Sequence, residues 1–270
     1  MTAPMKPILP RYVGDIWASD IVVLPESTRK NKYLLVFIEY LSKWSITVAL
    51  PSFDSDHVAN ALLFEVVLKY GTPSRLITDN GANYISDAMN AVCARLGIAR
   101  SRTSVEFAQS DGLCELLNRS IKTSLAAYIE RDPSKWDEYL PFVTFAYNTA
   151  RQSSTKYTPF ELMYGRKPAI PLPNELYPEA KKYETESWMH YLNSHIPIVH
   201  GQALENIKKA QTRQKRYYDK TKNTKYDYKP GDLVMRRNME KGSFPKERWL
   251  GPYIILEKNN IEGTSFKIKK

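Results

Sequence analysis

Cysteine is scarce in this chain, and long apolar runs are missing. Its 270 residues include two cysteines, Cys93 and Cys114, each inside a segment with helical periodicity. Two such thiols are typical of small buried side chains in a reducing compartment, and not of a disulfide-stapled secreted domain. No stretch approaches the roughly 20 apolar residues of a membrane-spanning helix, and the opening residues MTAPMKP lack the apolar run of a secretory signal. These absences predict a soluble, intracellular protein that has no membrane partner.

A zinc-binding pattern is also absent. The chain has four histidines, and three of them stand at His190, His195 and His200. Five-residue spacing advances about 500° along a helix, so successive imidazoles would be displaced by about 140°. They would not share a face, and no cysteine lies nearby. Zinc is therefore not indicated, and ordinary surface histidines are the expected alternative.

Basic residues are concentrated in the last seventy positions. Residues 201–270 carry 18 Lys and Arg against 8 Asp and Glu, so this segment holds the whole net charge of +10 and residues 1–200 are formally neutral. A basic appendage on a neutral core is typical of a protein that binds a polyanion, with an affinity that falls steeply as salt rises. A solvated lysine-rich helix would explain Lys208 to Lys225 alone. It explains the whole tail less well, because tyrosines and Trp249 alternate with the basic residues.

The order of predicted elements indicates an α/β protein with an appendage. Residues 1–11 hold three prolines and predict an extended lead-in. Within 12–175, three consecutive strands suggest an antiparallel meander, after which helices alternate with strands, as in a mixed five-stranded sheet flanked by helices. The expected strands are 16–24, 33–40, 44–50, 75–79 and 97–103, and the expected helices are 55–70, 86–96, 112–131 and 135–150. A basic helical connector should follow over 176–226. Short strands separated by Gly and Pro over 227–270 suit a small β-barrel.

Three carboxylates stand in contexts that could direct them to one point. Asp20 lies in the first predicted strand, Asp79 ends the fourth, and Glu115 opens a helix. Mg²⁺ prefers hard oxygen ligands and needs neither His nor Cys. Two such ions about 3.5–4 Å apart can clamp the attacking and leaving oxygens of a displacement at phosphorus. The spacing alone leaves a chance triplet open, because the chain contains 29 acidic residues.

Ordered motifs around these carboxylates favour the functional interpretation. The motifs are Trp17–Asp20, Leu24–Ser27, Lys32–Val36, Ser42–Trp44, Tyr70–Pro73, Ile77–Gly81, Gln109–Glu115 with Asn118 and Arg119, Ala146–Thr149, Thr158–Gly165, Pro230–Val234 and Trp249–Tyr253. In this order and at this spacing, over roughly residues 12–260, the chain resembles the integrase of gypsy-type LTR retrotransposons and retroviruses. A single motif would be weak, but an ordered series is specific.

The resemblance implies a ribonuclease-H-like catalytic core over 12–175, and a small DNA-binding barrel over 227–270. It implies metal-dependent 3′-end processing of a linear element DNA by water, followed by attack of the freed 3′-hydroxyl on target DNA. Asp20, Asp79 and Glu115 would be the catalytic ligands of two Mg²⁺ or Mn²⁺ ions. Chemistry on two DNA ends implies a homo-oligomer, and its substrate implies action in the nucleus.

DNA contacts are predicted on the helix of Glu115 and in the tail. Asn118, Arg119 and Lys122 follow Glu115 at i+3, i+4 and i+7, so they should share its face. Simple pairing of Arg119 and Lys122 with Glu115, worth a few tenths of a kcal/mol, is the plainer alternative. With the resemblance, the predicted nucleic-acid-binding residues are Asp111, Asn118, Arg119, Lys122, Arg236, Arg237 and Trp249.

Several positions depart from the family pattern. The His-Pro-Gln before the catalytic helix is Phe107-Ala108-Gln109 here, the basic residue after the catalytic Glu is Leu116, and the Asp of the second strand is Glu39. The zinc domain that normally precedes the core is also expected to be missing. Two hypotheses follow: an active integrase, or an integrase-derived, domesticated protein that binds nucleic acid without catalysis. A housekeeping ribonuclease H fits less well, because the downstream motifs and basic tail match integrases.

Overall fold

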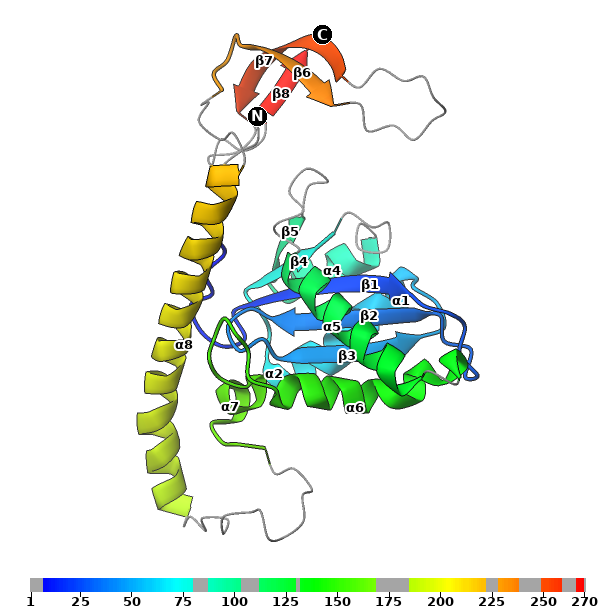
Figure 1. Ribbon diagram of the computed structural model, residues 1–270, viewed down its shortest axis with the longest axis vertical. Helices are drawn as coiled ribbons and strands as arrows, with labels where there is room; N and C mark the ends of the chain where they lie inside the picture. Colours follow the sequence, from blue (N-terminus) through cyan, green and yellow to red (C-terminus); the bar gives the residue numbers. More distant parts are fainter. Residues whose placement is uncertain are drawn as a thin grey trace. The chain divides into compact units, whose positions relative to one another are not determined.

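The computed structural model forms two compact units (Figure 1). It describes residues 7–79, 87–102, 112–129, 132–168, 185–221, 228–237, 249–258 and 266–269. The larger unit runs from Ile8 to Ala210, and the main part of the smaller one begins at Gln211. The boundary falls within one long helix, so the first part of the predicted connector belongs to the larger unit.

The larger unit follows the predicted order of elements closely. Its elements are β1 (Ile16–Val23), β2 (Tyr33–Glu39), β3 (Ser45–Leu50), α1 (Ser55–Ala61), a π-helical stretch (Leu62–Val67), α2 (Leu68–Tyr70), β4 (Arg75–Thr78), α4 (Asp87–Arg95), β5 (Ala99–Arg102), α5 (Gly112–Tyr128), a 3₁₀ turn (Pro133–Lys135), α6 (Trp136–Thr149) and α7 (Pro159–Tyr164). The short helix α7 lay outside the prediction. It forms because Thr158 and Glu161 make a reciprocal capping box and Pro159 occupies the first turn.

The five strands form one mixed sheet in the order β3-β2-β1-β4-β5, which confirms the predicted sheet (Figure 1). The first three strands pair antiparallel, because short turns connect them. The pairs β1–β4 and β4–β5 are parallel, because a helical crossover precedes each of β4 and β5.

Helices cover both faces of the sheet. Along β1, Ile16, Ala18 and Val22 point into the core shared with α5 and α6, whereas Trp17 points into the core shared with α1 and α4. This alternation follows from the two-residue period of a strand. Both faces are thus buried, and the even-numbered positions of β1 face α5.

Helix α6 also closes the free edge of β3. Asn148 is buried, its Oδ1 accepts from the Ser45 amide at 2.9 Å, and its Nδ2 donates to the Ser45 carbonyl at 2.8 Å. The carboxamide therefore takes the place of a neighbouring strand at this residue. Covering an edge in this way removes a site for unwanted pairing with another chain.

The long helix α8 (Thr185–Thr221) is anchored to the larger unit by its middle turns. Ala203 and Ile207 are buried against Leu41 and Leu162, and the Nδ2 of Asn206 donates to the Thr155 carbonyl at 3.0 Å. This contact explains why the first part of the helix belongs to the larger unit. Neither α8 nor any other helix in the described part of the chain combines the length and apolar character of a membrane span.

The smaller unit contains a three-stranded antiparallel sheet in the order β6-β7-β8. Its strands are β6 (Leu233–Arg237), β7 (Trp249–Lys258) and β8 (Phe266–Lys269). All three lie within 227–270, where the sequence predicts short strands. The predicted barrel is not confirmed, because the described residues of this unit form a three-stranded sheet.

Candidate active site

The parallel pairing of β1 with β4 brings two of the three predicted carboxylates side by side. Ser19 pairs with Thr78 in this register, so Asp20 and Asp79 each follow directly after a paired residue. Neighbouring strands lie about 4.7–4.9 Å apart, and side chains of equal parity share a face. Asp20 and Asp79 therefore share the face of Ala18 and Ile77, which is the face that α5 covers.

Helix α5 brings the third carboxylate to this end of the sheet. Cys114, Leu117, Ile121 and Leu125 form its buried stripe, at the i, i+3, i+7 and i+11 positions of an amphipathic helix. Glu115 lies beside this stripe and is exposed. The negative charge of Glu115 is the last of the causes that raise the pKa of Asp20, after burial and the charge of Asp79.

Asp20 is held in place by two donors. The Ile21 amide donates to Oδ1 of Asp20 at 2.8 Å, and Nδ2 of Asn118 donates to Oδ2 at 2.6 Å. Burial raises the pKa of Asp20, and the negative charges of Asp79 and Glu115 raise it further, while the two hydrogen bonds lower it. Asp20 is thus partly buried, and the charges of Asp79 and Glu115 add to the effect of burial on its pKa.

Hard divalent cations match the chemistry of this region. The donors are carboxylate oxygens, and clustered negative charge is stabilised by a cation. The Oδ1 of Asn118 is buried and has no hydrogen-bond partner among the residues that the structure describes, although buried polar atoms are normally paired. Within the described ranges, no three His, Cys, Asp or Glu side chains are already arranged as ligands of one ion. The residue types fit Mg²⁺ or Mn²⁺, and binding would require the side chains to adjust.

The predicted DNA-contact residues fall into three groups. Arg119 and Lys122 are exposed on α5, whereas Asn118 is 7% exposed and turned toward Asp20. Asn118 lies about 60° around the helix from Glu115 toward the buried stripe, because each residue advances 100°. Asp111 lies outside the described residues. Arg236, Arg237 and Trp249 belong to β6 and β7, where Arg237 pairs with Trp249, and their side chains are not described.

Two positions that depart from the family pattern can be placed. Leu116 is exposed on α5, and Glu39 is fully buried at the end of β2. The Glu39 carboxylate accepts from the amides of Leu41 and Ser42 and from the Ser42 hydroxyl, the last two at 2.6 Å. Glu39 therefore organises a turn. Phe107, Ala108 and Gln109 lie outside the described residues.

Two features of this region were not predicted from the sequence. The contact between Asn118 and Asp20 joins residues 98 positions apart. Its signal was the position of Asn118 at i+3 from Glu115, next to the apolar stripe, which could have predicted a buried carboxamide. Nothing in the sequence around Glu39 indicated that its carboxylate would be enclosed by its own turn.

Comparison with known proteins agrees with this geometry. Residues 10–106 match the integrase core domain family. The chain is 27% identical over 252 residues to a retrovirus-related Pol polyprotein from transposon 412 of Drosophila melanogaster, and 31% identical over 252 residues to the Gag-Pol polyprotein of feline leukemia virus. These matches cover 92% and 91% of this chain but 20% and 14% of the two polyproteins. The chain thus spans a fifth or less of either relative.

A solved structure shares the fold. The intasome of simian T-cell lymphotropic virus, determined by cryo-EM in complex with a PP2A regulatory subunit, superposes with a TM-score of 0.52 at 25% identity, over 68% of this chain and 63% of that chain. The mixed sheet with flanking helices is the ribonuclease-H-like arrangement of the polynucleotidyl transferases. Within that class, the chain carries an integrase catalytic core that is similar to those of retroviruses and retrotransposons.

Proposed function

We propose that this chain is a retrotransposon-type integrase that processes DNA 3′ ends and joins them to target DNA. The observation that carries the proposal is the register of β1 and β4, which places Asp20 and Asp79 side by side on the face that is covered by α5, the helix that carries Glu115. In a chain with an integrase core domain, this arrangement supports an Asp-Asp-Glu site for phosphoryl transfer with two divalent cations.

Each carboxylate has a distinct structural role in the proposed mechanism. Asp20 and Asp79 are ligands held on adjacent strands, and the Ile21 amide and Asn118 fix the orientation of Asp20. Glu115 completes the set from α5. The chemistry supplied by bound Mg²⁺ or Mn²⁺ is stabilisation of the negative charge that develops on the phosphate.

Two substitutions at phosphorus make up the reaction. In end processing, water forms a new P–O bond and the DNA 3′-oxygen leaves as a free hydroxyl. In strand transfer, that 3′-hydroxyl attacks a target phosphodiester, and the target's own 3′-oxygen leaves. Neither step needs a covalent bond to the protein, so no Ser or Tyr nucleophile is assigned.

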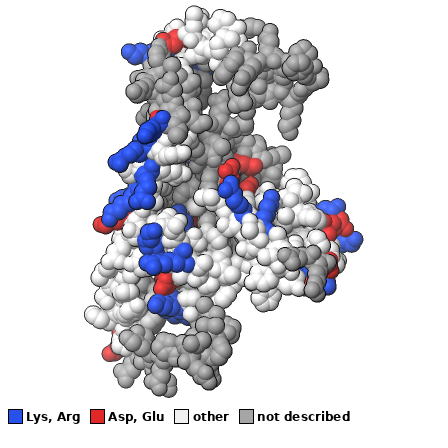
Figure 2. All heavy atoms as spheres, viewed as in Figure 1, with Lys and Arg blue, Asp and Glu red and all other residues white. Residues whose placement is uncertain are grey.

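Basic side chains support DNA as the partner. Arg119 and Lys122 are exposed on the same helix as Glu115. Figure 2 shows Lys and Arg side chains along α8. The exposed basic residues of this helix include Lys208, Lys209, Arg213 and Arg216. Contacts of this kind bind phosphates without reading sequence. The tail residues Arg236, Arg237 and Trp249 stay part of the proposal.

A homo-oligomer acting in the nucleus completes the proposal. The exposed side of α6 carries Tyr139, Phe142 and Phe145, with Phe142 69% exposed, and Tyr139 stacks on Tyr128 of α5. Clustered exposed aromatic side chains are typical of protein–protein interfaces. A second copy of the chain is a suitable partner, because integration joins two DNA ends.

A strand-transfer assay tests the proposed function. Purified protein is incubated with a short pre-processed DNA end and a target duplex in Mg²⁺ or Mn²⁺, beside the isosteric variant Glu115→Gln. We expect joined products from the native chain and none from the variant, with both proteins binding DNA. If neither protein forms products while both bind DNA, the chain is a nucleic-acid-binding protein derived from an integrase, and the enzymatic proposal fails.

A further inference from the structure

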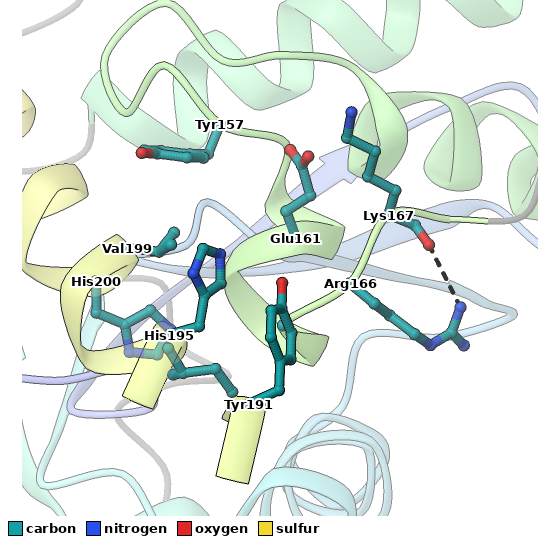
Figure 3. Close-up of a pocket in the computed structure, with 10 residues that line it drawn as sticks. Tyr157, Glu161, Arg166, Lys167, Tyr191, His195, Val199 and His200 are labelled. Atoms are coloured by element: carbon teal, nitrogen blue, oxygen red, sulfur yellow. Dashed lines mark hydrogen bonds between the residues drawn. The ribbon is translucent and has the colours of Figure 1, made fainter. Parts of the chain in front are cut away.

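A second candidate site lies in the larger unit, between α7 and the first turns of α8 (Figure 3). It is a pocket of about 130 Å³. Tyr157, Arg166 and Lys167 approach it from the segment around α7, and Tyr191, His195 and His200 approach it from α8. None of these residues belongs to the carboxylate site on β1, β4 and α5.

The walls of this pocket are held together by direct contacts. The Nε2 of His200 donates to the Leu162 carbonyl at 2.7 Å, and the Tyr157 hydroxyl donates to Gln202. Gly165 ends α7 with a φ of 68°, and a Cβ there would lie 2.8 Å from the Cδ1 of Ile196. A larger residue at position 165 would be strained by this φ and would displace the Ile196 side chain, so glycine favours the close contact between α7 and α8.

The size of the pocket limits what can enter. Sites for whole small molecules usually measure about 300–1,000 Å³. A volume of about 130 Å³ suits one ring-sized group, such as a single nucleobase or a single side chain. The occupant is therefore best sought as one unit of a polymer.

The lining combines cationic side chains with stacked rings, and the Arg166 guanidinium lies 5.1 Å from the centroid of the Phe160 ring. Within the described residues, Arg166 and Lys167 have no carboxylate within salt-bridge distance, and Glu161, the acidic residue of the lining, is engaged by the amide and hydroxyl of Thr158. The Tyr191 and His195 rings stack with centroids 4.7 Å apart and planes 21° apart. Trp188 continues the stack at 5.3 Å from Tyr191. Cations beside aromatic rings are typical of surfaces that bind unpaired bases.

We propose that this pocket binds one unpaired nucleotide of DNA. Its base would contact the rings of Tyr191 and His195, and its phosphate would lie at Arg166 and Lys167. This assignment rests on the proposed function in one respect, because DNA is the polymer that the proposed function would bring to the protein. An acidic peptide could pair with Arg166 and Lys167, but it would not explain the stacked rings of Tyr191 and His195.

Binding of a single-stranded oligonucleotide tests the pocket directly. The full chain is titrated into a short oligonucleotide that carries 2-aminopurine, whose fluorescence is quenched when the base stacks, and affinity is followed by anisotropy. The key variant is His195→Ala, which removes one ring at an exposed helical position. The matched control is His190→Ala, which lies on the same helix, is also exposed and does not line the pocket.

We expect His195→Ala to abolish the quenching and to weaken single-strand binding roughly five- to tenfold, as for the loss of one base–aromatic stack. The double variant Arg166→Ala, Lys167→Ala should weaken binding by about the same factor and flatten its salt dependence. Removing two exposed cations elsewhere, with Lys69→Ala and Lys135→Ala, should change it less than twofold. Circular dichroism confirms that each variant is folded.

Three outcomes would overturn the assignment. Quenching that survives His195→Ala would exclude stacking in this pocket. If removing Lys69 and Lys135 weakened single-strand binding as much as removing Arg166 and Lys167, the effect would be explained by net charge alone. Displacement of the oligonucleotide by an acidic peptide of equal length, through Arg166 and Lys167, would assign the pocket to a protein partner.

The strand-transfer assay keeps the two proposals separate. If the native chain joins DNA but His195→Ala binds single strands normally, the pocket proposal fails and the proposed function stands. If the native chain joins no DNA but shows quenching that depends on His195, the enzymatic proposal fails and the pocket stands.

Discussion

Two carboxylates of the same sheet, the partly buried Asp20 and the fully buried Glu39, have opposite surroundings. Glu39 is fully enclosed and receives hydrogen bonds from the amides and hydroxyl of its own turn. Asp20 receives two hydrogen bonds and lies within range of two further carboxylates. Burial is the main cause that raises the pKa of each group.

This difference distinguishes Glu39, a carboxylate that stabilises the fold, from Asp20, which is proposed to bind a cation. The turn of Glu39 supplies donors from the backbone and also holds Lys43, whose Nζ donates to the Tyr40 carbonyl at 2.6 Å. The surroundings of Asp20 supply two donors but also the negative charges of Asp79 and Glu115. A buried carboxylate surrounded by donors stabilises the fold, whereas one left beside like charges stabilises it little and can bind a metal.

Substituting each carboxylate should give the largest difference in stability between the two sites. Glu39→Ala leaves several buried donors unpaired, so we expect it to lower the free energy of unfolding by about 3 kcal/mol or more. Asp20→Asn relieves repulsion from Asp79 and Glu115, so it should change that free energy by no more than about 1 kcal/mol, toward higher stability. Denaturant unfolding of both variants measures the contrast. A large loss of stability in Asp20→Asn, with little in Glu39→Ala, would reverse the two roles.

Added metal should sharpen the same contrast. We expect Mg²⁺ or Mn²⁺ to raise the melting temperature of the native chain, because a ligand that binds the folded state stabilises it, by about 2.7 kcal/mol at one hundred times its dissociation constant. A chelator should reverse the shift, and Asp20→Asn should abolish it. The control is Lys43→Met, a substitution in the turn of Glu39. This variant should keep the full metal-dependent shift in melting temperature. An equal shift in Asp20→Asn would place the metal elsewhere.

The smallest expected effect concerns pH and the turn of Glu39. Burial lowers the pKa of Lys43 to about 8, although the charge of Glu39 partly opposes this. Because the folded pKa lies below the ordinary value of 10.5, the unfolded chain binds more protons between these limits. Stability from this group should therefore rise by roughly 1–3 kcal/mol from pH 8 to 10.5 and be lost as pH falls.

Comparing the native chain with Lys43→Met isolates that contribution, since both share every other titrating group. The measurement is the free energy of unfolding at several pH values across this range. Parallel curves for the two proteins would show that Lys43 is not buried as described.

Local pattern was sufficient for most of the fold. The two-residue alternation of β1 and the apolar stripe of α5 located these elements to within a few residues, because periodicity depends on nearby positions. The short helix α7 was missed, since its signal is a capping box within a proline-rich segment. The barrel prediction went further than the three strands the structure describes.

The sequence by itself determined the order of strands and helices, the basic character of the tail and the three carboxylates in their ordered motifs. Tertiary structure alone decided which groups surround each of them. Asn118 meets Asp20 because α5 packs across β1, and the pocket exists where α8 returns to α7. These contacts depend on how distant segments pack, and packing depends on complementary shape that no local pattern records.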